Sequence, residues 1–489
     1  MSKRVLLIFP HFLKGRRVQP KVEIPLGLLC VATPVSLADY TVKIIDQRIE
    51  SDWHSLLIKE LSLNPLCVGL STMTGQQLHF ALEISRLVKK YSETPVVWGG
   101  IHPSLLPDQT LHNENIDVVV QGEGEETFLE LVEAFEGTRP LPSVKGIWFK
   151  EEGIVKQTEC RPFLDLNQQA PLVYDLFDLS KYNRVLFDVQ HQPFFTSRGC
   201  PRQCTFCFNT ALNQKKWRAM DPDLVVERVK DFVEKYNVQG LRFNDSNFFI
   251  DLERGRRILK GIIEANLGIV ISKLNTDANT LFMLTKDDLA LLTQAGCRRL
   301  SVAVESASKK IQALFKKPVA VDQVLKFNRS LKQSAIVPNY VFMMGVPTET
   351  KDDLMESISL AFRLIDENPE AGISWNIYTP YPGTELFNIT VKHGLTIPQG
   401  VEEWIPFHYR NLTQNGPWLS KEMRKITRML DFCSFFIGQK SLIRPIEKTN
   451  RLAMLLGKLY SPVARKRVKN LWYQFPLEIN LARIFRLYG

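Results

Sequence analysis

Long apolar runs, internal repeats and low-complexity tracts are all missing from this sequence of 489 residues. A spanning helix needs about 18 or more consecutive apolar residues, so the sequence predicts none. The apolar start meets Pro10 and then the charged Lys14, Arg16 and Arg17, which indicates a buried strand rather than an export segment. The ordinary 23% of charged residues predicts a folded chain, and the length predicts two or three domains.

Cysteine is scarce, and its placement does not form a disulfide pattern. Of the eight cysteines, Cys200, Cys204 and Cys207 crowd into one short segment, and the other five are scattered. A small secreted protein held by disulfides has a denser and more even spacing. We therefore expect a reducing, cytoplasmic setting in which the clustered thiols bind metal.

Acidic residues are nearly absent from the last fifty residues. From Lys440 onward there are eleven basic residues and only Glu447 and Glu478 as acids, which accounts for nearly all of the net charge of +10. Basic residues alternate with apolar and aromatic ones in 466–473 and 481–488. This pattern allows a helical cap on the protein with a solvated basic face, or a peripheral contact with a membrane surface. Nucleic acid is not expected as a partner, because no RNA- or DNA-binding module accompanies the charge.

Two series of short apolar strands alternate with helical segments, which predicts an α/β protein. The first series predicts a doubly wound, Rossmann-like sheet with strands at 4–9, 41–46, 67–71, 95–98 and 117–121. The second, counting the strand before the cysteines, predicts a partial (β/α)6 barrel with further strands at 240–243, 269–274, 299–304, 337–343 and 372–378. The predicted division is a first domain at 1–137, a linker with a small hairpin at 138–190, the barrel at 191–390 and a helical, basic C-terminal region at 391–489.

The cysteine segment has the spacing C-x3-C-x2-C. Thiolates are the usual ligands of iron–sulfur clusters, and three on one loop can hold three irons of a [4Fe–4S] cubane while the fourth iron stays open to a substrate. The alternative is a zinc-stabilised, non-enzymatic binding module. Structural zinc sites are normally closed by four ligands, and a second C-x2-C is lacking here.

With Phe206 before its third cysteine, this segment resembles the signature of the radical S-adenosylmethionine (SAM) superfamily. The resemblance implies that Cys200, Cys204 and Cys207 hold the [4Fe–4S] cluster, that SAM binds its open iron, and that Phe206 lies near the adenine. The family's Gly-Gly-Glu stretch for the methionine amine is replaced here, so that role passes to Asn244 or Asp245. Glu305 and Ser306 resemble the strand end that lies near the ribose in the family.

The strand ends of the first domain carry small residues and lack a nicotinamide fingerprint G-x-G-x-x-G. Ligands of open parallel sheets bind at these ends. The segments Trp98–Pro103 and Gly122–Glu125 resemble the cobalamin-binding domain that precedes many radical SAM domains. The resemblance implies cobalamin contacts at Ser71, Thr72, Gly99, Gly100, Gly122, Glu123 and Gly124. The cobalt-ligating motif D-x-H-x-x-G is absent, which leaves the lower ligand, and cobalamin binding itself, open.

Together these resemblances imply a cobalamin-dependent radical SAM enzyme, and we expect a C-methyltransferase that acts on an unactivated carbon through a 5′-deoxyadenosyl radical and methylcobalamin. The alternative is a cyclase, ring-contraction or rearrangement enzyme of the same class that transfers no methyl group. The implied partners are a low-potential electron donor of the flavodoxin or ferredoxin type and a small-molecule or lipid-like substrate. Trp375, Tyr381 and Trp404 are aromatic candidates for the cavity wall, although core packing explains them equally well.

Overall fold

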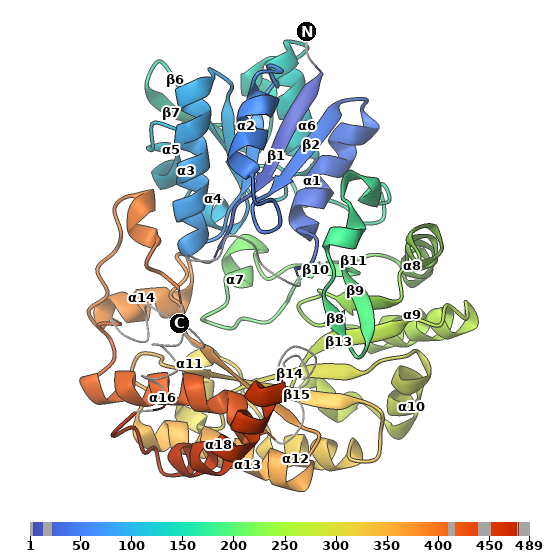
Figure 1. Ribbon diagram of the computed structural model, residues 1–489, viewed down its shortest axis with the longest axis vertical. Helices are drawn as coiled ribbons and strands as arrows, with labels where there is room; N and C mark the ends of the chain where they lie inside the picture. Colours follow the sequence, from blue (N-terminus) through green and yellow to red (C-terminus); the bar gives the residue numbers. More distant parts are fainter. Residues whose placement is uncertain (1–2, 13–21, 409–415, 439–450, 477, 479–489) are drawn as a thin grey trace. The chain divides into compact units, whose positions relative to one another are not determined.

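The computed structural model describes residues 3–12, 22–408, 416–438, 451–476 and 478, with the side chains of 451–456 set aside (Figure 1). The chain divides into two compact units. The first contains residues up to Val185 together with Ile397–His408, and the second contains Leu186–Thr396 and the residues from Tyr409 onward. No helix of the described residues is long and apolar enough to cross a membrane.

The first unit is built on a seven-stranded sheet in the order β2-β1-β3-β4-β5-β6-β7. The five parallel strands are β1 (Arg4–Phe9), β2 (Thr41–Asp46), β3 (Val68–Ser71), β4 (Val96–Gly99) and β5 (Val118–Val120). Helices α1 (Leu26–Leu37) and α6 (Glu125–Glu136) pack together, as do α2 (Trp53–Leu61) and α3 (Gln76–Tyr91). The predicted doubly wound sheet is thereby confirmed.

The hairpin expected within the linker lies inside this sheet. Strands β6 (Ile147–Glu151) and β7 (Ile154–Gln157) pair with each other, and β6 pairs antiparallel with β5, placing Phe149 opposite Val118. Both residues are buried in the same apolar core. The sequence pattern showed the hairpin but not its partner, because strand pairing depends on packing between distant segments.

Residues 397–408, which the sequence groups with the C-terminal region, pack in the first unit. The indole of Trp404 is 1% exposed and donates to Gln109 Oε1 over 2.6 Å, while Gln109 Nε2 donates to the Pro398 carbonyl. Gln109 belongs to α5 (Pro107–Leu111), which follows α4 (Ile101–Leu105). Trp404 is therefore a core residue of this unit, in keeping with the packing alternative.

The second unit has a sheet in the order β16-β15-β14-β13-β12-β9-β8, in which the six strands from β16 to β9 in this order are parallel. Its strands are β8 (Val185–Leu186), β9 (Val189–Phe194), β12 (Gly240–Phe243), β13 (Val270–Asp277), β14 (Arg299–Glu305), β15 (Val337–Met344) and β16 (Gly372–Ile377). This is the predicted partial barrel of six parallel strands. Trp375 lies in its core, stacked on Phe342 with ring centroids 4.9 Å apart.

The helices of this unit follow the strands in the order that the sequence predicts. They are α8 (Pro222–Tyr236), α9 (Leu252–Glu264), α10 (Lys286–Gln294), α11 (Lys309–Phe315), α12 (Val321–Ser330), α13 (Lys351–Glu367) and α14 (Glu385–Lys392). Thr285 and Thr350 begin α10 and α13 with reciprocal capping boxes, closed by Asp288 and Asp353. Such caps satisfy the first free N–H groups of a helix. Two further helices, α16 (Lys421–Ile437) and α18 (Arg451–Lys469), follow in the C-terminal region.

Candidate functional site

The cysteine loop begins at a glycine that no other residue could replace without a clash. Gly199 ends β10 (Ser197–Gly199), which pairs antiparallel with β11 (Trp217–Ala219). Its φ is +80°, and a Cβ atom built there would lie 2.0 Å from the Lys216 carbonyl oxygen. Glycine alone enters this backbone region at low cost. The chain can therefore turn here and enter the loop with Cys200 as its next residue.

The middle of the loop is held by the barrel's own helices. Thr205 N–H donates to the Phe315 carbonyl over 3.2 Å, and its hydroxyl donates to the Leu314 carbonyl over 2.7 Å. The Thr205 carbonyl in turn accepts from the N–H of Leu386, at the start of α14. Phe206 packs edge-on against Phe315 with centroids 4.8 Å apart. The loop is thus fixed to the ends of two helices that flank the sheet.

The three thiols on this loop suit cluster binding. All are free and half-buried, and backbone N–H groups of Arg202 and Asn209 donate to the sulfurs of Cys200 and Cys207. Burial raises the pKa of Cys204 to about 11, so binding iron must displace a proton from it. Within the described ranges, no three His, Cys, Asp or Glu side chains gather around a single ion position. A cubane places each thiolate on its own iron, so its cysteines need not share one position.

Charged side chains surround the thiols in two ion pairs. Arg202 Nε lies 2.9 Å from Asp277 Oδ2, and Lys317 Nζ lies 3.0 Å from Glu305 Oε1. Lys317 favours the thiolate forms of all three cysteines. Neither Asp277 nor Lys317 was a sequence candidate. Asp277 lies beyond the predicted end of its strand, and Lys317 stands in a short basic loop that carries no motif.

The predicted SAM-binding residues lie in two different environments. Asn244 is exposed at the end of β12 and accepts from Arg242 Nε over 2.8 Å. Asp245 is fully buried, and its carboxylate accepts from Thr196 N–H, the Thr196 hydroxyl and Ser197 Oγ. Burial raises the pKa of Asp245 despite these bonds. Asp245 therefore holds the backbone at Thr196 and Ser197, just before the cysteine loop.

Two further contacts place the strand ends around the loop. Asn209 Nδ2 donates to Ser246 Oγ over 2.9 Å, which joins the cysteine loop to the end of β12. Glu305, the last residue of β14, has a φ of +66°, so its side chain leaves the strand in an unusual direction. Ser306 is buried and accepts from the N–H of Ser308 over 3.1 Å. The candidates from β12, β14 and the loop are therefore brought together at the carboxyl edge of the sheet.

In the first unit, the small residues predicted for cobalamin lie at the carboxyl ends of β3, β4 and β5. Gly100 has a φ of +100°, and an added Cβ would lie 2.6 Å from the Thr72 carbonyl oxygen. Gly122 has a φ of +86° and is exposed, with no atom within 4 Å of an added Cβ. These strand ends therefore offer exposed backbone that a large planar cofactor can approach closely.

Other residues at these strand ends hold the backbone in place. Thr72 is buried, and its hydroxyl and N–H both donate to the Gly99 carbonyl. Glu123 accepts from the N–H of Leu164 over 3.0 Å. His102, after β4, is fully buried; its Nδ1 lies 3.1 Å from Thr74 Oγ1, and no hydrogen-bond partner is found for Nε2. Burial lowers the pKa of His102 to about 3, so the imidazole is neutral.

A doubly wound unit with open strand ends and a half-barrel with a three-cysteine loop define a class of enzyme. Residues 18–132 match the B12 binding domain model, and residues 194–361 match the radical SAM superfamily model. The chain belongs to the cobalamin-dependent radical SAM enzymes. Its cofactors are accordingly a [4Fe–4S] cluster, SAM and cobalamin. The three thiols of the cysteine loop fit the cluster, and the exposed strand ends of the first unit fit cobalamin. Enzymes of this class act on a small molecule and require a reductant.

Known proteins are similar to this chain over most of its length. An uncharacterized methyltransferase of Pyrococcus horikoshii is 29% identical over 91% of this chain and 94% of its own length. The solved structure of the cobalamin-dependent radical enzyme OxsB covers 99% of this chain and 75% of that chain at 17% identity, with a TM-score of 0.71. The methyltransferase TsrM from Kitasatospora setae covers 81% and 76% at 17% identity, with a TM-score of 0.67. Both structures share the fold.

Proposed function

We propose that this enzyme transfers a methyl group to an unactivated carbon of its substrate. The observation that carries the proposal is the loop of three half-buried thiols at the carboxyl edge of a half-barrel, in a chain with a second, cobalamin-type unit. Its relatives named as methyltransferases include that of P. horikoshii and the hopanoid C-3 methylase of Methylococcus capsulatus, 24% identical over 398 residues. When bound, the cluster supplies the electron that cleaves SAM to a 5′-deoxyadenosyl radical, and cobalamin carries the methyl group.

The residues of the chain then have distinct roles in the proposal. Cys200, Cys204 and Cys207 hold three irons, and the backbone donors to two of their sulfurs stabilise the negative charge there. Phe206, packed on Phe315, contacts the adenine with its half-buried ring. Exposed Asn244 is the better candidate of its pair to accept from the methionine amine, because the Asp245 carboxylate is enclosed by Thr196 and Ser197.

The ribose and the cobalamin have their own proposed contacts. We place the ribose near the Glu305–Ser306 strand end, where Lys317 neutralises the buried Glu305 carboxylate. For cobalamin, the contacts are the backbone of Gly99, Gly100, Gly122 and Gly124, with Ser71, Thr72 and Glu123 holding the strand ends. The support is the exposed backbone at Gly122 and the close approach at Gly100.

The second candidate is an oxidative cyclase or rearrangement enzyme with the same cofactors. An anaerobic magnesium-protoporphyrin IX monomethyl ester cyclase of Rubrivivax gelatinosus is 26% identical over 78% of this chain. The two candidates differ in the mass of the product, because methylation adds one CH2 and ring formation or rearrangement does not.

The test is an anaerobic preparation with cobalamin supplied during expression. Absorption spectra report cluster and corrinoid, and chromatography measures 5′-deoxyadenosine. Cys204→Ala should abolish deoxyadenosine formation while cobalamin stays bound. Cys160→Ala, which removes an exposed thiol of the first unit, should change neither. Deoxyadenosine formation by the Cys204 variant would count against the cluster assignment, and an unmethylated product would count against methyl transfer.

Partners and setting complete the proposal. A donor of the flavodoxin or ferredoxin type supplies the low-potential electron, and the reducing cytoplasm is the setting, since the described cysteines are all free thiols. The substrate is a small or lipid-like molecule. We also propose a peripheral membrane contact through the basic C-terminal region.

A further inference from the structure

The exposed side of helix α18 combines basic and apolar side chains without any acid. Residues 451–474 contain no Asp or Glu. Lys458, Leu459, Pro462, Val463 and Lys466 are all exposed, and their spacing places them along one side of the helix. Leu459 is 67% exposed.

The packed side of α18 faces α16, and the two helices run side by side (Figure 1). Ser461 Oγ donates to the Phe436 carbonyl over 2.7 Å, and Arg465 donates to the Ile437 carbonyl over 2.9 Å. These bonds fix the end of α16 beside residues 461–465. Phe435, next to that anchor, is also exposed. Both helices therefore carry exposed apolar side chains.

The turn after α18 carries two further exposed aromatic residues. Arg467, one helical turn beyond Val463, is buried, and its guanidinium donates to the carbonyls of Trp472, Gln474 and Phe475 and pairs with Glu478. The turn thus folds over Arg467 and presents Trp472 and Phe475, with Phe475 78% exposed. Arg467 is accordingly not one of the cations available to an outside partner.

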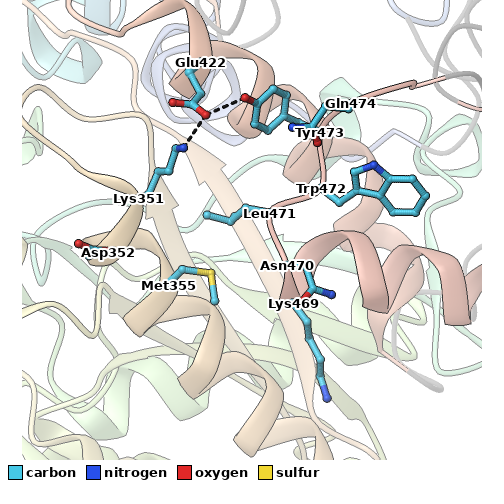
Figure 2. A pocket seen from close by; sticks show the side chains of 10 residues that line it. All are labelled: Lys351, Asp352, Met355, Glu422, Lys469, Asn470, Leu471, Trp472, Tyr473 and Gln474. Atoms are coloured by element: carbon cyan, nitrogen blue, oxygen red, sulfur yellow. Dashed lines mark hydrogen bonds and ion pairs between the residues drawn. The ribbon is translucent and has the colours of Figure 1, made fainter.

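A second anchor holds this turn from the other side. Tyr473 OH donates to Glu422 Oε1 over 2.7 Å, and Lys351 Nζ lies 2.5 Å from the same carboxylate. In Figure 2 these three side chains meet, and the indole of Trp472 points away from them. All four residues line an open cavity of about 500 Å³. The turn is therefore held on both sides, and the Trp472 ring also lies against the Arg467 guanidinium, whose carbon is 4.3 Å from the ring centroid.

We propose that this surface, made of Lys458, Leu459, Pro462, Val463 and Lys466 with Trp472 and Phe475, lies on a phospholipid bilayer that contains anionic lipids. Basic side chains attract anionic headgroups, and aliphatic and aromatic side chains insert at the boundary of the acyl chains. The nearby acids Asp366 and Glu478 are engaged by Arg465 and Arg467, so they do not oppose such an approach. The inference deepens the membrane contact proposed above and is independent of methyl transfer.

Flotation of the full-length protein with lipid vesicles tests the proposal. We expect binding to vesicles of phosphatidylcholine mixed with phosphatidylglycerol, weakened by salt, and little binding to phosphatidylcholine alone. Leu459→Ser and Phe475→Ser should each weaken binding about tenfold, since each removes a large apolar group from the bilayer boundary. Lys458→Glu with Lys466→Glu should remove the preference for phosphatidylglycerol.

Ile154→Ser is the matched control, because Ile154 is a similarly exposed aliphatic residue, 63% exposed, on β7 of the first unit. It should bind vesicles like the wild type, and thermal unfolding checks that all variants fold. Vesicle binding unchanged in the Leu459 and Phe475 variants overturns the proposal. So does a change of particle mass in those variants by light scattering, which would assign the surface to a second copy of the chain. Methyl transfer is tested separately, by the product mass with a water-soluble substrate and no vesicles. The two proposals can therefore fail independently.

Discussion

Lys317 and Glu305 form an ion pair of 3.0 Å in which both side chains are nearly buried beside the cysteine loop. Burial disfavours the ammonium, but Glu305 and Cys204 compensate, so the pKa of Lys317 is raised. The pair joins the end of β14 to the segment after α11, whose last carbonyls hold Thr205. It therefore stabilises both the strained strand end and the loop that carries the thiols.

Removing one member of this pair should be costly. Lys317→Met leaves Glu305 as an uncompensated buried charge, which is expected to cost about 3–5 kcal/mol of unfolding free energy and to reduce iron incorporation. The double variant Lys317→Met with Glu305→Gln should recover most of that stability. Lys316→Met is the control, because its pair with Glu385 is half exposed and is expected to contribute below about 1 kcal/mol. Anaerobic denaturant unfolding measures all four proteins, and equal losses for Lys316 and Lys317 would contradict the argument.

Gly199 should be indispensable to the cluster. Gly199→Ala places a Cβ against the Lys216 carbonyl, so the loop must shift, and we expect loss of cluster absorbance with cobalamin retained. Gly153→Ala is a matched control. Its φ of +78° carries the same backbone strain, but an added Cβ meets no atom within 4 Å. A Gly199 variant that reconstitutes the cluster like the Gly153 variant would show that the close approach does not matter.

Substitutions of Asn244 and Asp245 should affect different quantities, namely SAM binding for Asn244 and stability for Asp245. Asn244→Ala is expected to raise the KM for SAM about tenfold with unchanged stability, because an exposed acceptor is lost. Asp245→Asn replaces a buried acceptor of three hydrogen bonds and should lower the unfolding free energy by about 1–3 kcal/mol. Deoxyadenosine kinetics and thermal unfolding distinguish the two. A stability loss at Asn244, or a KM effect alone at Asp245, would reverse the assignment.

These residues show how far the sequence carries the site. The strands and helices followed from apolar periodicity, which is a property of each segment by itself. The predicted strands Arg4–Phe9, Thr41–Asp46 and Gly240–Phe243 have the observed bounds. The C-x3-C-x2-C spacing marked the metal loop because all of its ligands lie in one segment. Asp277 and Lys317 were missed because they reach the thiols only through the fold. The difference between Asn244 and Asp245 likewise depends on Thr196 and Ser197, some fifty positions earlier.

The same distinction applies to the basic tail. Its sequence pattern allowed either a helical cap or a membrane-binding surface. Some of its described residues pack inside the unit, and others are exposed. Arg467 and Tyr473 are bound internally, whereas Lys466 and Trp472 are exposed. The predicted stretch 481–488 lies outside the described residues.

Gly100 should govern cobalamin retention without affecting the cluster. Gly100→Ala introduces a Cβ 2.6 Å from the Thr72 carbonyl oxygen, so the ends of β3 and β4 must separate. We expect the purified variant to lose most of its corrinoid absorbance and keep its iron. Gly137→Ala shares a positive φ of +88° but has open space around it, and should retain both cofactors. Corrinoid content equal to the wild type in the Gly100 variant would move the cofactor away from these strand ends.

Glu349 should make stability depend on pH in a direction opposite to that of most carboxylates. The side chain is buried, accepts from Gly345 N–H over 2.7 Å, and has its pKa raised to about 8 by burial. The folded state therefore keeps a proton that the unfolded chain releases above its ordinary pKa near 4.5. This contribution is fully present below that lower value and is lost as the pH rises toward 8, at about 1.4 kcal/mol per pH unit.

Glu349→Gln removes that titration while keeping an acceptor for Gly345. Its unfolding free energy relative to the wild type should therefore rise steadily between about pH 5 and pH 8. Glu422→Gln is the control. The hydrogen bonds from Lys351 and Tyr473 lower the pKa of Glu422, so its contribution is constant across the same window. Denaturant unfolding at several pH values checks both variants. Parallel pH profiles for wild type and Glu349→Gln would mean that the pKa of Glu349 is not raised in the folded protein.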